Sequence, residues 1–271
     1  MHRSSPPAST TNAMHAVMTV KSKATSKASQ RAGRETQTRA SASRSSPTVV
    51  ALEMQRCYDL VEELGRGVVY LGSARREETD AQYALARELA RDVARALDCT
   101  TWSGVGPGFM DAVTKGALDA DKPVGGFMIL LESGQRGKLQ PSRVHPYLPQ
   151  SCYLTTSFFS ARKHGLVDAG VRVSAQDRTA FIALPGGVGT LDEIFEILAL
   201  LQLKRIGSAH DVPFIFMNYD GHYDGLLSFL ARDMVASGAL GAGELDPHFV
   251  VCDDNAAVLA YLSQFYAQGD V

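Results

Sequence analysis

The sequence has few cysteines and histidines, and their spacing excludes the common metal frameworks. Its four cysteines, Cys57, Cys99, Cys152 and Cys252, are far apart and form no C-x-x-C pair. Its seven histidines form no H-x-x-x-H or H-E-x-x-H pattern. Isolated cysteines are typical of free thiols in a reducing compartment. We therefore expect no metal site, no cofactor and a cytoplasmic location.

Long apolar runs and an excess of positive charge are also missing. No secretory leader and no stretch of about 18 apolar residues is present, so we expect neither export nor contact with a membrane. The net charge of −2 argues against a general nucleic-acid binder. The 271 residues can form one large α/β domain or two small ones.

Charge and composition divide the chain near residue 48. Residues 1–48 carry eight Lys or Arg and one acid, a sum of +7, whereas the remainder sums to −9. The first segment is rich in Ser, Thr and Ala and has few large apolar side chains, so we predict that it is disordered. It could be a solvated tail, a transit-like peptide, or sequence upstream of the true start codon at Met14 or Met18. We assign residues 49–271 to one catalytic domain.

Residues 67–266 alternate between strand-like and helix-like patterns. Buried strands are predicted at 67–72, 100–102, 123–131, 151–155, 179–184, 212–217 and 249–251. Helices are predicted at 79–98, 109–120, around Arg162 and Lys163, from Leu191, at 223–237 and at 255–266. Such alternation predicts an α/β fold, a Rossmann-like doubly wound parallel sheet with helices on both faces. Residues 132–150 are expected to form a loop beside the ligand.

Three glycine-containing turns follow predicted strands, at 72–75, 104–108 and 186–189. In an open parallel sheet such turns lie along one edge, where ligands bind. Residues 104–108 have the spacing G-x-G-x-G rather than G-x-G-x-x-G, which disfavours a dinucleotide. The turn at 186–189 lacks the lysine of a P-loop, which disfavours hydrolysis of a nucleoside triphosphate.

The most informative stretch is PGGVGTLDE, residues 185–193. It joins the apolar run 180–184 to a helical pattern, so free N–H groups and a helix dipole meet at one point and suit a phosphate. Glu193 lies one turn inside that anion site. A carboxylate is poorly placed to bind phosphate, which indicates a catalytic or sugar-binding role for Glu193.

This stretch resembles the P-G-G-x-G-T-x-x-E signature of the LONELY GUY (LOG) family, whose members were long mislabelled as lysine decarboxylases. The resemblance covers most of residues 66–265 and includes the pair Arg162-Lys163. It implies hydrolysis of the N-glycosidic bond of a nucleoside 5′-monophosphate, typically a cytokinin riboside monophosphate or AMP, to free base and ribose 5-phosphate. Arg162 and Glu193 would be catalytic. The substrate-binding residues would be Gly72, Ser73, Arg75, Gly106, Gly108, Lys163, Gly186, Gly187, Val188, Gly189, Thr190 and Asp192.

Such a reaction builds positive charge on the sugar ring, which a carboxylate such as Glu193 can stabilise. Arg162 offers a permanently charged fork for the phosphate or the leaving base, or it forms a salt bridge to Asp168 or Glu193. Many family members carry Met-His-x-Arg-Lys where this chain has Phe159-Ser160-Ala161-Arg162-Lys163, so the substrate range stays open. Arg75 is expected to contact the phosphate or the ribose, and its neighbour Arg76, which lies outside the motif, is the less favoured partner.

Three other functions and the state of assembly have to be considered. A nucleotide or molybdenum-cofactor carrier of the same fold would not need the Arg–Glu pair, and a DNA-processing protein would need a basic domain. An amino-acid decarboxylase would need a lysine placed to hold pyridoxal phosphate, and no lysine of this sequence has a recognisable context for that.

The predicted helix at 194–203 is apolar on most faces, so it lies in the core or meets a second subunit. The family resemblance favours a homodimer or larger assembly.

Overall fold

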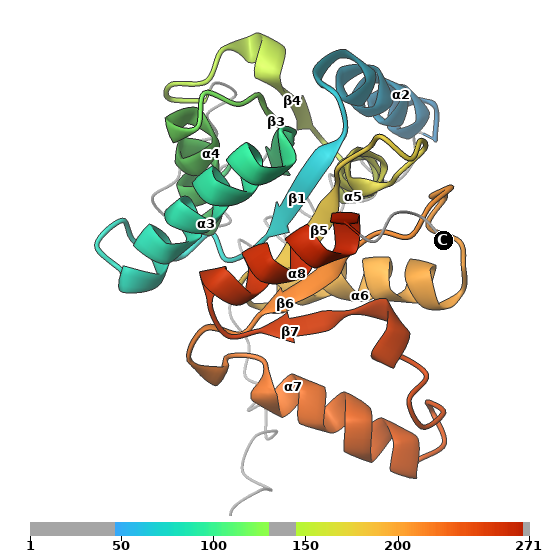
Figure 1. Ribbon diagram of the computed structural model, residues 1–271. Coiled ribbons are helices and arrows are strands. Elements are labelled where there is room, and N and C mark those ends of the chain that lie inside the picture. The colour runs from blue at the N-terminus through green and yellow to red at the C-terminus, as the bar shows by residue number, and fades with distance from the viewer. Residues whose placement is uncertain (1–46, 130–144, 268–271) are drawn as a thin grey trace, which may run out of the picture. The chain divides into compact units, whose positions relative to one another are not determined.

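The computed structural model describes residues 47–129 and 145–267. Their elements follow in the order α2 (Pro47–Leu64), β1 (Gly67–Leu71), α3 (Ala81–Leu97), β2 (Thr100–Ser103), α4 (Phe109–Asp119), β3 (Val124–Ile129), η1 (Gln150–Cys152), β4 (Tyr153–Thr156), α5 (Phe159–Gly170), β5 (Ala180–Ala183), α6 (Val188–Gln202), β6 (Phe214–Met217), η2 (Tyr219–Gly221), α7 (Asp224–Ser228), η3 (Phe229–Met234), η4 (Asp246–His248), β7 (Val250–Cys252) and α8 (Asn255–Ala267). Figure 1 shows their arrangement. The prediction of a disordered segment at 1–48 falls almost wholly outside the described residues and stays a prediction.

Within residues 47–129 and 145–267, seven strands form one sheet in the order β4-β3-β2-β1-β5-β6-β7. Every pairing is parallel, including β1 with β2 and β1 with β5. The chain winds outward from β1 toward β4 and then returns to start again at β5. The winding direction therefore reverses between β1 and β5, which confirms the predicted Rossmann-like doubly wound sheet.

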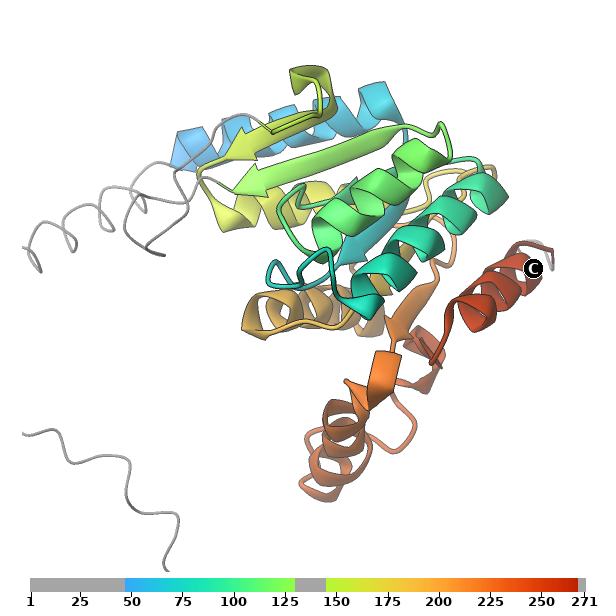
Figure 2. The same cartoon turned by 90° about the vertical axis from the view of Figure 1, so that its left-hand side faces the viewer.

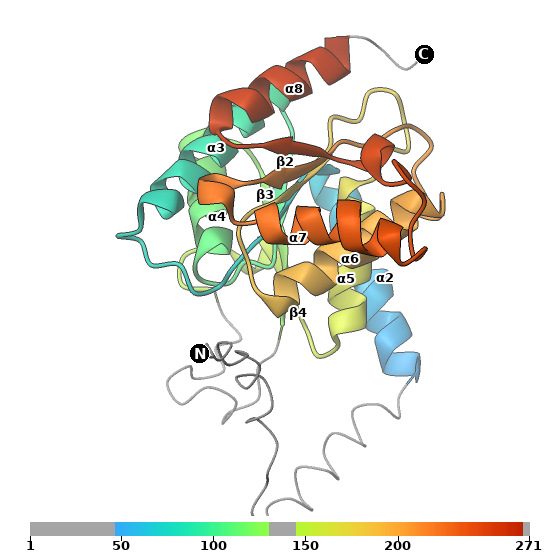
Figure 3. The ribbon, with the colours of Figure 1, turned by 90° about the horizontal axis from the view of Figure 1, so that it is seen from below.

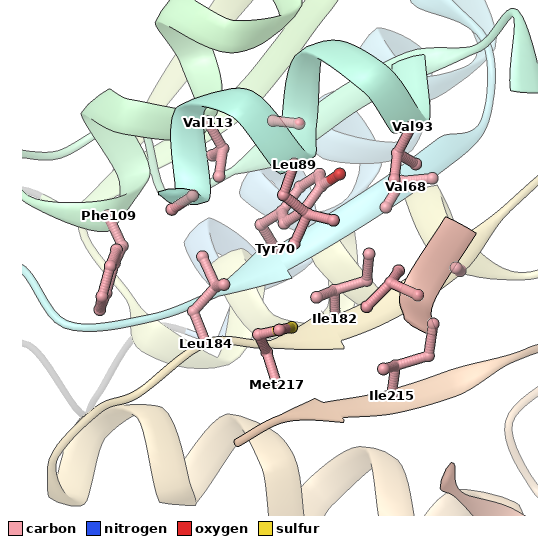
Figure 4. Close-up of a cluster of buried hydrophobic side chains, with 14 of the residues drawn as sticks. Val68, Tyr70, Leu89, Val93, Phe109, Val113, Ile182, Leu184, Ile215 and Met217 are labelled. Atoms are coloured by element: carbon pink, nitrogen blue, oxygen red, sulfur yellow. The ribbon is translucent and has the colours of Figure 1, made fainter. Parts of the chain in front are cut away.

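Helices cover both faces of the sheet because successive strand residues point to opposite sides. Val68 and Tyr70 of β1 pack in a cluster with α3, α4 and α8, and Figure 4 shows its side chains between helix and strand. Val69 and Leu71 pack in a second cluster with α2, α5 and α6. Figure 3 shows α8 on one side of the strands and α5, α6 and α7 on the other. Helices α3 and α4 lie side by side on the face of the sheet that α8 also covers (Figure 2).

Local sequence sets the ends of α3. Asp80 is its N-cap, and the Asp80 carboxylate accepts a hydrogen bond from the Gln82 N–H at 2.8 Å. Asp98 ends the helix with a left-handed backbone, φ 50°. None of the described helices is long and apolar enough to cross a membrane.

Apart from shifts of up to two residues at the ends of elements, the structure differs from the predicted elements in four places. Helix α2 was not predicted, and α6 begins at Val188 instead of Leu191. The helix predicted at 223–237 changes from α to π geometry at Phe229. The expected loop at 132–150 lies partly outside the described residues, and it ends in the short helix η1.

Two buried tyrosines allow the contribution of a buried hydroxyl to stability to be tested with and without a hydrogen-bond partner. The Tyr70 hydroxyl has no hydrogen-bond partner among the described residues, whereas the Tyr223 hydroxyl donates to the Leu184 carbonyl at 2.6 Å. We expect Tyr70→Phe to leave the free energy of unfolding unchanged or raise it by up to about 1 kcal/mol, because it removes an unsatisfied buried group. Tyr223→Phe should lower it by about 1 to 3 kcal/mol, because a buried carbonyl loses its donor. Urea denaturation of both variants checks this, and equal losses would contradict it.

Candidate active site

The reversal between β1 and β5 brings the glycine turns together around Ser73. The Ser73 N–H donates to the Pro185 carbonyl at 3.1 Å, and the Ser73 carbonyl accepts from the Phe109 N–H at 3.0 Å. Gly108 has φ +74°, and a Cβ built on it would lie 2.4 Å from the Ser73 carbonyl oxygen. The turns after β1, β2 and β5 are thus in direct contact, and Gly108 is required for that contact.

A cleft of about 540 Å³ opens at this point. Its lining residues are Ser73, Arg75, Arg76, Glu77, Thr79, Asp80, Pro185, Gly186 and His222. Arg76 contributes to the wall although its sequence position placed it outside the motif, but it is ion-paired to Asp80 at 2.8 Å. Arg75 is exposed and has no ion pair among the described residues, so its charge is available to an anion.

Helix α6 begins beside the cleft without a side-chain cap. Gly187 is the N-cap and makes no side-chain hydrogen bond, and the Leu191 N–H donates to its carbonyl at 2.9 Å. The N–H groups of Val188, Gly189 and Thr190 precede that bond and have no intrahelical acceptor. Val188 is 85% exposed. The positive end of a 15-residue helix therefore faces open space.

The glycines of this turn differ in what surrounds them. A Cβ on Gly186 would lie 2.2 Å from the Thr190 hydroxyl oxygen, so the buried Thr190 side chain fills that place. A Cβ on Gly187 or Gly189 would meet no atom within 4 Å. The fold does not require glycine at those two positions. Of the other predicted glycines, Gly72 packs on Phe109 and Leu184, and Gly106 packs on Met110.

Arg162 of α5 and Glu193 of α6 form a buried ion pair. Arg162 Nη2 lies 2.9 Å from Glu193 Oε1, and the two residues are 9% and 8% exposed. Arg162 Nε has no hydrogen-bond partner among the described residues, and Glu193 Oε1 has the Arg162 guanidinium as its ion-pair partner. A Cβ on Gly104 would lie 2.3 Å from Arg162 Nη2, so the turn after β2 must leave room for the guanidinium. Burial raises the pKa of Glu193, and the charge of Arg162 partly offsets that rise.

Lys163 and Asp192 also meet between α5 and α6. Lys163 Nζ lies 3.1 Å from Asp192 and 2.8 Å from Glu196. Asp168 instead pairs with Arg66 at 3.1 Å, so the salt bridge that sequence left open for Arg162 is the one to Glu193. The predicted residues thus form two groups. Ser73, Arg75 and Gly186 line the cleft, whereas Arg162, Lys163, Asp192 and Glu193 form ion pairs between α5 and α6. The first two turns of α6 connect the two groups.

Sequence reasoning missed Glu77, Thr79 and Asp80 of the cleft wall, and it also missed two residues that contact the backbone at this site, His222 and Glu53. His222 lines the cleft from the loop after β6, and no motif pointed to it. The Glu53 carboxylate accepts hydrogen bonds from the N–H groups of Ser157 and Phe158 at 3.0 and 3.2 Å, so α2 caps the start of the helix that carries Arg162. The amphipathic pattern of residues 47–64 could have indicated α2 but not the contact of Glu53.

Comparison with known proteins decides the family. A family model described as possible lysine decarboxylase matches residues 110–262. The probable cytokinin riboside 5′-monophosphate phosphoribohydrolase LOGL3 of Oryza sativa subsp. japonica is 31% identical over 168 residues, which cover 61% of this chain and 68% of that protein. The chain belongs to this family. It is the LONELY GUY family that the PGGVGTLDE stretch resembles.

Other LONELY GUY relatives align over shorter stretches. LOGL6 of Oryza sativa subsp. japonica is 50% identical over 58 residues, 21% of this chain and 22% of that protein. LOG3 of Arabidopsis thaliana is 48% identical over 58 residues, 21% of this chain and 25% of that protein. In these two matches the chain spans about a quarter or less of its relatives' length. Among solved structures, the molybdenum cofactor carrier protein of Chlamydomonas reinhardtii superposes with a TM-score of 0.45 at 18% identity, covering 75% of this chain and 99% of that one.

The glycines provide a test that separates folding from ligand binding. We expect Gly108→Ala to lower the free energy of unfolding by at least about 2 kcal/mol, because alanine disfavours φ +74° and its Cβ would strike the Ser73 carbonyl. Gly189→Ala should leave it unchanged or raise it by up to about 1 kcal/mol, because its Cβ meets open space in a helix. Urea denaturation measures both. Equal destabilisation would show that residue 189 is constrained by the fold.

Proposed function

We propose that this protein hydrolyses the N-glycosidic bond of a nucleoside 5′-monophosphate, a cytokinin riboside 5′-monophosphate or AMP, to free base and ribose 5-phosphate. The observation that carries the proposal is the buried Arg162–Glu193 pair, in which Glu193 lies in the second turn of α6, the helix that begins without a side-chain cap. The relatives LOGL3 and LOG3, which are named as phosphoribohydrolases for such nucleotides, support it.

The phosphate would bind at the start of α6. The N–H groups of Val188, Gly189 and Thr190 supply donors at the positive end of the helix dipole. Gly187 and Gly189 leave open space in which a phosphate oxygen can approach the backbone. Arg75 and Ser73, which also line the cleft, would contact the phosphate or the ribose.

This position of the phosphate directs the sugar toward Glu193. Hydrolysis breaks the bond between C1′ and the base nitrogen, the electron pair leaves with the base, and the water oxygen bonds to C1′. The ionised Glu193 carboxylate would stabilise the positive charge on the sugar ring and take a proton from the water. That proton then passes to the departing base nitrogen, so that the free base is neutral and Glu193 is ionised again. Arg162 would hold Glu193 ionised and contact the leaving base through its unpartnered Nε. Lys163 and Asp192 would adjust the charge around the phosphate.

Assembly into a homodimer or larger oligomer, and a cytoplasmic location, belong to the same proposal. In the single chain, Phe195 and Leu203 of the α6 segment are 39% and 65% exposed, although the apolar pattern is compatible with complete burial. These exposed side chains support the alternative in which the helix meets a second subunit.

Base release from AMP and from isopentenyladenosine monophosphate, followed by chromatography, tests the activity. We expect Glu193→Gln to lower kcat by about 100-fold to 10,000-fold, because it removes the carboxylate and keeps the shape. Glu196→Gln is the matched control, since it lies one turn further along α6 and pairs with Lys163, and it should keep most of the activity. Nucleotide binding without base release in the unsubstituted protein would instead favour a carrier.

The acid limb of the pH profile tests the ion pair. A raised pKa means that Glu193 is protonated at a higher pH than an ordinary glutamate, so kcat should fall as the pH drops through that raised value. Arg162→Gln removes the positive charge that lowers the pKa, so its acid limb should move to higher pH. Lys163→Gln should move it less, because Lys163 has the smaller effect on Glu193. An unchanged limb in Arg162→Gln would show that Glu193 is not the group that titrates.

A further inference from the structure

His222 is a cleft residue that no motif or comparison assigns. It stands on the loop between β6 and α7, which forms a third wall beside the turns after β1 and β5. Its Nε2 lies 3.1 Å from the Gly186 nitrogen and 3.1 Å from the Gly186 carbonyl oxygen. Gly186 begins the turn that leads into α6, so His222 touches the peptide next to the proposed phosphate site.

The loop holds the imidazole firmly in this place. The Tyr223 hydroxyl donates to the Leu184 carbonyl at 2.6 Å, and the Tyr223 N–H donates to Asn218 Oδ1 at 2.7 Å. The ring of His222 packs edge-on against Tyr223, with centroids 4.8 Å apart. The loop is thereby tied to β5 and to its own start, and His222 can reach Gly186 without loop rearrangement.

The single atom Nε2 cannot hydrogen-bond to the N–H and to the carbonyl of Gly186 in the same protonation state. When Nε2 carries no proton, it accepts a hydrogen bond from the Gly186 N–H. When Nε2 is protonated, it donates to the Gly186 carbonyl instead, and the Gly186 N–H is released toward the cleft. If both ring nitrogens are protonated, the imidazole also places a positive charge there.

We propose that His222 is a positioning residue for a phosphomonoester, and that it exposes the Gly186 N–H and adds positive charge when it is protonated. This inference rests on the proposed function, because the ligand is the phosphate of the nucleotide. The charged groups facing His222 across the cleft are Arg75, Arg76, Glu77 and Asp80, of which Arg76 and Asp80 neutralise each other. On its own loop, Asp220 and Asp224 are engaged by Gln82 and Asn218.

Ribose 5-phosphate binding to the full chain, measured by calorimetry at pH 6 and pH 8, tests the proposal. His222→Gln is the matched variant, because its amide can donate to or accept from Gly186 but does not titrate. Protonation of the ligand affects both proteins equally. The affinity of the unsubstituted protein relative to His222→Gln should rise by about twofold to fivefold between pH 8 and pH 6, the range for an exposed charge contact.

A second measurement needs no ligand. The Gly186 amide resonance of the nitrogen-15-labelled chain should shift between pH 8 and pH 6 in the unsubstituted protein and stay constant in His222→Gln. Ribose 5-phosphate binding with the same pH dependence in both proteins would overturn the role of His222 and leave the proposed function intact. No binding to either protein would contradict both, whereas an amide that does not titrate would contradict the Gly186 contact itself.

Discussion

The parallel pairing of β1 with β5 is the constraint on which the site depends. Because the winding direction reverses at this pair, the connections that leave β1 and β5 turn to opposite sides of the sheet and leave a cleft between them. The hydrogen bond from Ser73 to Pro185 fixes the distance between the two turns. Gly108 brings the turn after β2 against the same point. The start of α6 is therefore placed by sheet topology.

Stabilisation of the fold does not by itself explain the buried Arg162–Glu193 pair. Removing two charges from water costs free energy that a single contact at 2.9 Å poorly offsets, and Arg162 Nε has no hydrogen-bond partner among the described residues. A polar ligand bound at this place would supply a partner for that donor. The pair is also supported from outside, because Lys163 links α5 to α6 and Glu53 of α2 caps α5. Three helices thus determine the position of one guanidinium.

Much of this could be predicted from the sequence, and the failures have physical reasons. Strand and helix patterns were strong because β1, β5 and β6 are buried on both faces, which gives continuous apolar runs. The start of α6 was placed three residues late because glycine and threonine, which disfavour helix interiors, occupy its first turn.

Contacts between distant segments could not be read in the same way. The contact of His222 with Gly186 depends on a loop that Tyr223 ties to β5, and the cap of Glu53 on α5 depends on where α2 crosses the sheet. Neither has a local pattern. The Arg162–Glu193 contact was one of two salt bridges left open, because charge alone does not distinguish Asp168 from Glu193.

The sheet order also has a consequence for synthesis on the ribosome. Val68 of β1 has its β2 neighbour, Thr101, soon after it emerges, but its other neighbour is Ala180 of β5. At typical elongation rates this edge of β1 waits roughly 5 to 20 seconds for its partner strand. The first four strands can assemble meanwhile as a half-sheet in which β1 is an edge strand with unpaired backbone N–H and C=O groups. The nascent chain should be most dependent on chaperones in that interval, which ends when the segment that precedes the PGGVGTLDE stretch emerges.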